Sequence, residues 1–313
     1  MVVVIALLAP GQGSQTPGML TPWLDGPDAE DTLAHWSDAT SLDLRRLGTE
    51  AGAEEIKDTA VTQPLVVATA LLAAARLGAR IPLPAGAPAA GHSVGELAAA
   101  AVAGVLSPDA AVALAAVRGR EMAAACALEP TGMSAVLGGK PDGVMAKLDE
   151  LGLDPANRNG AGQVVAAGSV AALAALAENP PERARVIPLP VAGAFHTRFM
   201  APAEDALRAH AGDISPADPD RPLLSNADGS VVSDGAEALR RLVAQVTRPV
   251  RWDSCMAALR ELGVTAVIEL PPAGTLVGLV KRDLKGTATL ALKTPDDLDA
   301  AVDLITEHAG ADQ

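Results

Sequence analysis

The sequence is poor in aromatic side chains. Its 313 residues include three tryptophans, two phenylalanines and no tyrosine, so aromatics make up 2% of the chain. Base-stacking platforms for nucleic acid are therefore excluded. Acidic residues outnumber basic ones by 38 to 24, and the formal net charge of −14 gives little general attraction for nucleic acid or anionic lipid. We expect neither nucleic acid nor a membrane as a partner.

Cysteine is also scarce. Cys126 and Cys255 lie far apart and lack the spacing of metal ligands, which predicts reduced thiols and no metal site. The sequence also shows no apolar run close to the roughly 20 residues that span a bilayer. Its opening, MVVVIALLAPGQGSQ, has no basic region and is typical of a buried first strand rather than a signal peptide. We expect a cytoplasmic monomer.

The two ends of the chain show the pattern of an α/β protein. Residues 2–8 predict a strand followed by a glycine-rich loop, and a helix-rich stretch then runs to about residue 80. A short strand is expected before residues 91–95, which read GHSVG. This Gly-x-Ser-x-Gly pattern is typical of the strand–turn–helix that carries the nucleophile of α/β-hydrolases. The predicted core is therefore α/β-hydrolase-like.

The middle of the chain has a different rhythm. From about residue 131 the order strand, helix, strand, strand, helix, strand is complete in about 65 residues, which is the ferredoxin-like pattern. We interpret it as an inserted subdomain over residues 126–199. Residues 1–125 and 200–313 would then form the catalytic core.

Ser93 lies at the centre of the GHSVG stretch, either as a nucleophile or as a small residue in a glycine-rich turn. A serine hydroxyl needs a base to become reactive. His92 is its neighbour, and adjacent side chains on a tight turn tend to point apart. His196, in VAGAFHTRFM, is the remaining candidate base, with a buried packing histidine as the alternative. The other histidines lie in polar helical stretches: His35, His210 and His308.

Two further positions have alternative interpretations. The loop around Gln12 follows the first strand, but a dinucleotide motif would need glycine where Thr16 stands. Such a loop can instead bring a backbone amide to a serine elbow as part of an oxyanion hole. Arg118 interrupts an apolar helical run, either as a solvated edge residue or as a fixed guanidinium that holds a carboxylate.

The combination of motifs, in this order and spacing, resembles the malonyl-CoA:acyl-carrier-protein transacylase family over nearly the whole chain. The motifs are PGQGSQ at 10–15, TQP at 62–64, GHSVGE at 91–96, RGREM at 118–122, NGAGQVV at 159–165, GAFHT at 193–197 and QVTRPVRW at 245–252.

The resemblance implies a role for each candidate residue. These are Ser93 as the acylated serine, His196 as its base, Arg118 as the partner of the malonyl carboxylate, Gln12 and Val94 as oxyanion-hole amides, Gln245 as the residue whose main-chain carbonyl orients the histidine, and Phe195, His92 and Asn159 as pocket residues. It implies transfer of malonyl from malonyl-CoA to the phosphopantetheine thiol of acyl carrier protein, for fatty-acid synthesis and without any cofactor.

Other functions remain open at this point. A transferase that loads polyketide carriers would share every one of these residues. A serine hydrolase is disfavoured because no acid occupies an evident triad position between Ser93 and His196, where the acids are assigned to the inserted subdomain. An acidic carrier protein would need a local basic patch on so acidic a chain. The candidates for that patch are Lys281, Arg282, Lys285, Arg198 and Arg248.

Overall fold

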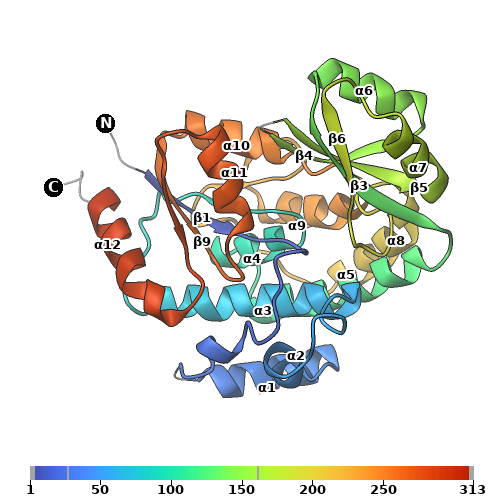
Figure 1. Cartoon of the computed structure of the whole chain (residues 1–313). Coiled ribbons are helices and arrows are strands. Elements are labelled where there is room, and N and C mark those ends of the chain that lie inside the picture. The colour runs from blue at the N-terminus through green and yellow to red at the C-terminus, as the bar shows by residue number, and fades with distance from the viewer. Residues whose placement is uncertain (1–3, 27, 161, 310–313) are drawn as a thin grey trace.

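The computed structural model describes residues 4–26, 28–160 and 162–309. The chain forms two separate sheets, one mostly parallel and one antiparallel, each with its own helices (Figure 1). The predicted fold class is confirmed. Val2 and Val3 of the predicted first strand lie outside the described residues.

The main sheet has six strands in the order β10-β9-β1-β2-β7-β8. All neighbouring pairs are parallel except β7 with β8. Because parallel strands end at the same edge of a sheet, the loops that follow β1 and β2 meet there. The strands are β1 (Val4–Ala9), β2 (Ala89–Gly91), β7 (Leu223–Leu224), β8 (Val231–Val232), β9 (Val264–Glu269) and β10 (Ala288–Ala291).

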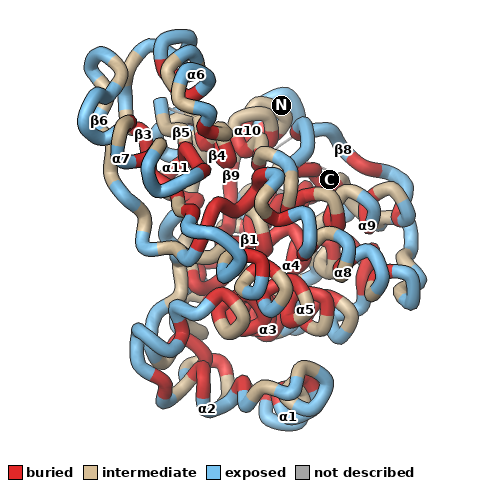
Figure 2. The backbone as a smooth tube through the Cα atoms, turned by 90° about the vertical axis from the view of Figure 1, so that its right-hand side faces the viewer, coloured by how far each residue is buried: buried red, intermediate tan, exposed pale blue. Residues whose placement is uncertain are grey.

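Strand β1 shows how both faces of this sheet are covered. Ile5, Leu7 and Ala9 pack into one hydrophobic core, whereas Ala6 and Leu8 pack into a second one. This alternation follows from the two-residue period of a strand, and it explains why the strand is apolar throughout. In Figure 2 the buried segments of β1, α3 and α4 run through the middle of the molecule.

The first core also contains residues of helices α3 (Thr59–Gly78), α4 (Gly95–Val102), α5 (Pro108–Cys126) and α12 (Leu298–Ala309), and the second contains residues of α10 (Trp252–Glu261) and α11 (Thr275–Asp283). Outside the small lobe described below, the other helices are α1 (Ala29–Thr40), α2 (Leu44–Thr49), α8 (Ala201–Ala211) and α9 (Gly235–Ala244), with short 3₁₀ turns η1 (Thr21–Trp23), η2 (Arg198–Met200), η3 (Gln245–Thr247) and η4 (Pro295–Asp297).

Helix α3 corrects one expectation from the sequence. It has 20 residues with a mean hydropathy of 1.5 over its most apolar window, so its length and composition would suffice to cross a bilayer. However, 72% of that window is buried inside the protein. The helix packs along α5 beneath the main sheet, as the core helix of a folded domain does (Figure 1).

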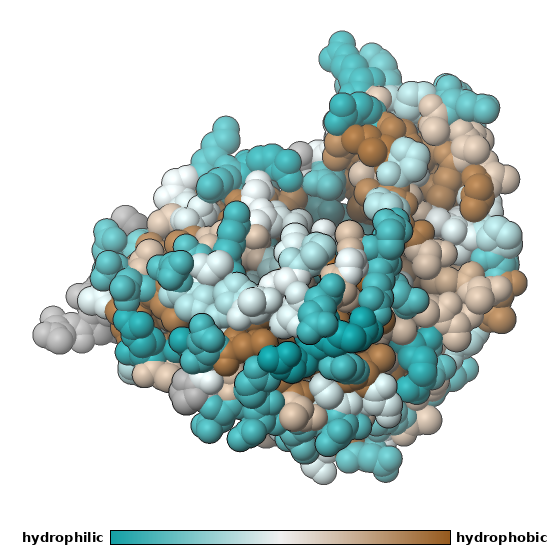
Figure 3. Space-filling view, turned by 60° about the horizontal axis from the view of Figure 1, so that its bottom comes forward, coloured by the Kyte–Doolittle hydropathy of each residue, from teal (hydrophilic) through white to brown (hydrophobic). Residues whose placement is uncertain are grey.

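The antiparallel sheet belongs to a small lobe that stands out from the main body (Figures 1 and 3). Its elements follow the predicted order: β3 (Thr131–Gly138), α6 (Pro141–Glu150), β4 (Asp154–Gly160), β5 (Gln163–Ser169), α7 (Val170–Glu178) and β6 (Ala184–Pro188). The strand order is β4-β5-β3-β6, and the lobe has its own hydrophobic core. A bridge between Asn157 and Val250 ties β4 to the main body. The limits 126 and 199 remain our proposal for its extent.

Candidate active site

Ser93 lies on a tight turn between β2 and α4, with a left-handed φ of 55°. Two glycines make this turn possible. A Cβ on Gly91 would lie 2.1 Å from the carbonyl carbon of Gly95, and a Cβ on Gly95 would lie 2.3 Å from the carbonyl oxygen of Ala9. No other residue fits at either position without displacing the main chain. The turn therefore holds the serine where the loops after β1 and β2 meet.

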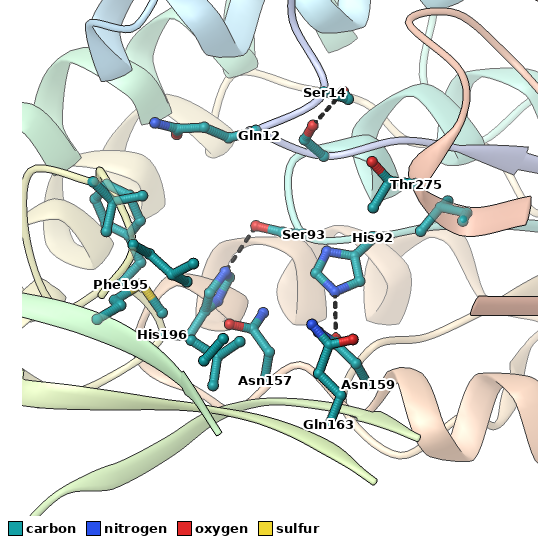
Figure 4. A pocket seen from close by; sticks show the side chains of 18 of the residues that line it. Gln12, Ser14, His92, Ser93, Asn157, Asn159, Gln163, Phe195, His196 and Thr275 are labelled. Carbon is teal, nitrogen blue, oxygen red and sulfur yellow. Dashed lines mark hydrogen bonds between the residues drawn. The ribbon is translucent and has the colours of Figure 1, made fainter. Parts of the chain in front are cut away.

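The Ser93 side chain points at His196, as Figure 4 shows. The Ser93 Oγ lies 2.7 Å from His196 Nε2, and His196 Nδ1 lies 2.9 Å from the main-chain carbonyl oxygen of Gln245. A carbonyl oxygen can only accept, so Nδ1 carries the proton and Nε2 accepts from the serine hydroxyl. The histidine is itself held in a left-handed conformation, with φ of 62°.

His196 is neutral at physiological pH. Only 3% of the residue is exposed, and burial, followed by the nearby Arg118 guanidinium, lowers its pKa to about 3. Both causes act in the same direction because each disfavours a second positive charge in the site. A neutral imidazole with a free Nε2 lone pair can take a proton from Ser93.

Arg118 is buried beside this pair and is not a solvated edge residue, since only 1% of it is exposed. Its Nη2 donates to Gln245 Oε1 at 2.8 Å and to Ser93 Oγ at 3.3 Å. Its Nη1 donates to Gln63 Oε1 at 2.6 Å. Burial lowers the pKa of Arg118 to about 10, so the side chain stays protonated at neutral pH. The site thus contains a fixed cation that can pair with a carboxylate.

The loop after β1 lies against the turn that carries Ser93. A Cβ on Gly11 would lie 2.5 Å from the carbonyl oxygen of His92, so only glycine allows this approach. The Ser93 amide is already used, because it donates to Asn226 Oδ1 at 2.8 Å. Within the described residues, no acceptor pairs with the main-chain amides of Gln12 and Val94. These two amides remain available for an anionic oxygen.

His92 is held away from the serine. Its Nε2 lies 2.9 Å from Asn159 Oδ1, and its ring packs edge-on against Trp252 with the ring centroids 5.6 Å apart. Burial also lowers the pKa of His92. Its contacts join the serine turn to strand β4 of the small lobe, and they do not make it a base for Ser93 (Figure 4).

A cavity of about 400 Å³ opens onto these residues, a size ordinary for a small-molecule site. It is bounded by the loop after β1, the serine turn, the small lobe and α11. The lining includes Gln12, His92, Ser93, Arg118, Asn157, Asn159, Gln163, Phe195, His196, Thr275 and Arg282. The structure thus brings all the sequence-predicted pocket residues together.

Sequence reasoning missed a buried acid in this site. Glu96 is 4% exposed, and its carboxylate accepts from the Asn226 amide at 3.0 Å and from Gln245 Nε2. Burial raises the pKa of Glu96 to about 7. The expectation that the acids between Ser93 and His196 belong to the inserted subdomain is therefore wrong for Glu96. One signal was available, because Glu96 is the lone charge in the apolar stretch VGELAAAAV.

The basic residues expected at a docking patch do not form one cluster. Lys281 and Arg282 lie at the end of α11, and Arg282 borders the cavity, with its Nη2 3.4 Å from Gln163 Oε1. Arg198 pairs with Asp154 at 3.6 Å, whereas Arg248 lines a different cavity. Across residues 4–26, 28–160 and 162–309, no group of three or more potential metal ligands is found.

Comparison with known proteins gives a consistent result over the whole chain. Residues 7–306 match the family model described as the acyl transferase domain. The malonyl CoA-acyl carrier protein transacylase of Mycobacterium tuberculosis is 60% identical over 303 residues, covering 96% of this chain and 100% of that protein.

Solved structures agree with the sequence comparison. The crystal structure of MCAT from Mycobacterium tuberculosis has a TM-score of 0.92 at 58% identity, covering 98% of this chain and 99% of that one. A second structure, described as a type II PKS acyl-carrier protein in complex with its malonyl-transacylase, has a TM-score of 0.88 at 30% identity, covering 96% and 99% of the two chains. The chain therefore belongs to the malonyl-CoA:acyl-carrier-protein transacylase family and is an acyltransferase.

Proposed function

We propose that this enzyme transfers malonyl from malonyl-CoA to the phosphopantetheine thiol of acyl carrier protein through an ester on Ser93. One observation carries the proposal: the Ser93 Oγ lies 2.7 Å from His196 Nε2 and 3.3 Å from Arg118 Nη2. A nucleophile, its base and a cation for the substrate carboxylate thus meet at one oxygen atom. The names of the relatives given above support malonyl and a carrier protein as substrates.

In the first half-reaction, the malonyl carboxylate pairs with Arg118 and His196 takes the proton of Ser93. The serine Oγ attacks the thioester carbonyl carbon, and the resulting oxyanion accepts hydrogen bonds from the amides of Gln12 and Val94. The carbon–sulfur bond then breaks, and His196 returns the proton to the CoA thiolate. Malonyl remains on Ser93 as an ester.

In the second half-reaction, the carrier thiol enters the same cavity and gives its proton to His196. Its sulfur attacks the ester carbonyl, the carbon–oxygen bond to Ser93 breaks, and His196 protonates the departing serine oxygen. Gln245 keeps the histidine in the required tautomer throughout, because its carbonyl accepts only from a protonated Nδ1. The cycle needs no metal or redox cofactor for proton or electron balance.

The carrier has two candidate sources. Supply of malonyl units for fatty-acid synthesis is our first proposal. A polyketide carrier is the second, because a relative of 30% identity forms a complex described as holding a type II PKS acyl-carrier protein. Transfer rates from the malonylated enzyme to both carriers, measured side by side, would separate the two.

The direct test is intact-mass spectrometry after mixing the enzyme with malonyl-CoA. The wild type should gain one malonyl group and Ser93→Ala none. Ser14→Ala is a matched control, because Ser14 lines the same cavity and uses its hydroxyl to donate to the Gly11 carbonyl. Labelling that survives Ser93→Ala would refute the assignment. If the malonyl label is instead lost rapidly to water, and an added carrier thiol does not receive it, the enzyme is a hydrolase.

A further inference from the structure

A second cavity, of about 480 Å³, lies between strand β4, helix α9 and the segment after η3. Five arginines line this cavity: Arg158, Arg240, Arg241, Arg248 and Arg251. Two carboxylates, of Asp228 and Glu237, also line it. Such a concentration of arginines stands out in a chain with a net charge of −14. None of these residues has a part in the proposed reaction.

Strand β4 separates this cavity from the active site. Asn157 and Asn159 line the first cavity, whereas Arg158 between them lines the second. This division follows from the alternation of side chains along a strand. On this side, two main-chain hydrogen bonds join strand β4 to Val250. The Arg158 amide donates to the Val250 oxygen, and the Val250 amide donates to the Ala156 oxygen, each at 2.9 Å.

The carboxylates in the cavity neutralise only part of its positive charge. Glu237 accepts from both Arg240 and Arg241, with distances of 2.6 to 2.7 Å, and Asp228 accepts from Arg241 at 3.0 Å. Hydrogen bonds from Arg241 and Arg240 also lower the pKa of Glu237, which keeps it ionised.

Arg251 pairs with Asp253 at 2.9 Å, but two other guanidiniums of the cavity lack such partners. In the part of the chain that the structure describes, Arg158 and Arg248 have no carboxylate within 4.0 Å, and Arg158 Nε is buried without a hydrogen-bond acceptor. A buried donor with no acceptor is costly and calls for a missing partner. The unsatisfied donor here belongs to a cation, so an anionic acceptor would be its strongest partner.

We infer that this cavity binds a phosphate-bearing anion. Guanidinium groups that converge in a concave site match phosphate oxygens in charge and in hydrogen-bond geometry. The cavity volume lies within the usual range for small ligands. The shared chemistry is a phosphate or diphosphate group, which has two possible sources: the nucleotide part of CoA, or a separate free anion.

The cavity also touches the part of the chain that orients the candidate base. Gln245 lines it, and the Arg248 amide donates at 3.1 Å to the Gln245 carbonyl oxygen, the same atom that accepts from His196 Nδ1. An anion held by the Arg248 side chain would therefore be linked to that hydrogen bond through a single residue. An anion in this cavity would therefore act on the orientation of His196 and would not contact the reacting atoms.

The test is isothermal titration of the full-length protein with inorganic pyrophosphate at low salt. The wild type should bind, and Arg248→Gln and Arg158→Gln should each weaken binding by about tenfold or more, because a hydrogen bond to a charged group is lost. Arg183→Gln is the matched control, because Arg183 lies on the small lobe, outside the cavity, and pairs with Glu182 at 3.6 Å. Absence of binding to the wild type, or equal affinity of wild type and Arg248→Gln, would overturn the proposal. Arg248 is exposed, so its replacement is not expected to impair folding.

A second arm identifies the source of the anion and rests on the proposed function. If the CoA nucleotide occupies the cavity, Arg248→Gln should raise the KM for malonyl-CoA. The KM for malonyl-pantetheine, which lacks the nucleotide, should stay unchanged. If a free anion occupies the cavity, Arg248→Gln should change neither KM, and pyrophosphate should bind equally well in the presence of CoA. Both results support an anion site. Weaker carrier binding by Arg248→Gln without any pyrophosphate binding to the wild type would instead show a protein-docking surface and refute the inference.

Discussion

His196 Nδ1 lies 2.9 Å from the main-chain carbonyl oxygen of Gln245. The orientation of the candidate base therefore depends on the backbone of η3, whereas a serine protease uses the carboxylate of an aspartate. A carbonyl oxygen carries no full charge, so it fixes the tautomer without raising the basicity of the ring as much as a carboxylate would. This arrangement agrees with the low pKa of His196.

Replacement of Arg118 should remove the preference for a charged acyl group. Arg118→Ala leaves the malonyl carboxylate unpaired in a buried site, and loss of one partner of such a pair commonly costs about 3 to 5 kcal/mol, or roughly 10² to 10³-fold or more in kcat/KM. Acetyl transfer should fall little or rise. Arg118→Lys should also be impaired, because an ammonium cannot reproduce the planar fork.

Single-turnover acylation of Ser93 by malonyl-CoA and acetyl-CoA measures this effect. Arg120→Ala is the control, because Arg120 lies on the same helix with 63% of its side chain exposed. An Arg118→Ala enzyme that still prefers malonyl over acetyl would show that the carboxylate is recognised elsewhere.

Charge reversal at the end of α11 should separate the two half-reactions. Lys281 and Lys285 are exposed there, next to the Arg282 side chain at the cavity. The double variant Lys281→Glu, Lys285→Glu should slow transfer to an acidic carrier severalfold, and more at low salt, because opposite charges steer association. Loading of Ser93 by malonyl-CoA should be unchanged.

The measurement is the rate of each half-reaction at two salt concentrations. The double variant Lys57→Glu, Lys140→Glu makes the same change in net charge at two exposed positions outside α11, and it is the control. If both half-reactions slow equally, or neither slows, the carrier docks on another surface.

Glu96 should make the protein less stable as the pH rises. Burial raises its pKa from 4.5 to about 7, so the folded state holds this proton more tightly than the unfolded state does. Its contribution to the free energy of unfolding is therefore full below pH 4.5 and falls as the pH rises through 7. The linkage amounts to about 3 kcal/mol between these limits.

Urea unfolding of wild type and Glu96→Gln at about pH 5 and pH 8 tests this sign. The variant should be less stable than the wild type at the lower pH and recover by about 3 kcal/mol relative to it at the higher pH. Glu261→Gln, at an exposed position, should show no such change. A constant difference between Glu96→Gln and wild type at both pH values would contradict the assigned shift.

The serine turn should not tolerate a methyl group at its first glycine. A Cβ on Gly91 would lie 2.1 Å from backbone atoms of Gly95, so Gly91→Ala must displace α4 relative to β2. We expect a loss of stability on the order of 3 kcal/mol together with loss of Ser93 acylation. Gly86→Ala is the control, because within the described residues no atom beyond its two chain neighbours lies within 4 Å of its added Cβ. Thermal unfolding and intact mass would show both effects, and a stable, active Gly91→Ala enzyme would contradict this account of the turn.

Much of this architecture could be predicted from local sequence. The order of strands and helices in the small lobe follows from hydrophobic periodicity and turn residues, which act over a few positions. Ser93 and His196 lie in short motifs of the sequence, and the structure places the Ser93 Oγ 2.7 Å from His196 Nε2. Two-residue strands such as β7 and β8 leave almost no such pattern, and their place in the sheet depends on tertiary contacts.

The supporting residues of the site could not be found in this way. Asn226 belongs to Asn-Ala-Asp-Gly, whose composition predicts an exposed turn, yet it is fully buried and binds both the Ser93 amide and the Gly91 carbonyl. Gln63 belongs to the TQP motif, but that motif gave it no role, and its contact with Arg118 comes from a different helix across 55 residues of sequence. Such contacts depend on how elements that are distant in the sequence pack together, and the pattern of residues in one sequence does not reveal that packing.

The left-handed backbone at Ser93 and His196 opposes the stability of the fold. For a residue with a Cβ, this conformation lowers the free energy of unfolding by about 1 to 2 kcal/mol, whereas glycine adopts it without steric cost. Removing the reactive group with Ser93→Gly would therefore ease the torsion of the turn while abolishing acylation. If Ser93 is the nucleophile, as we propose, selection for heat resistance alone would favour its replacement by glycine, and only selection for turnover would keep a side chain at that position.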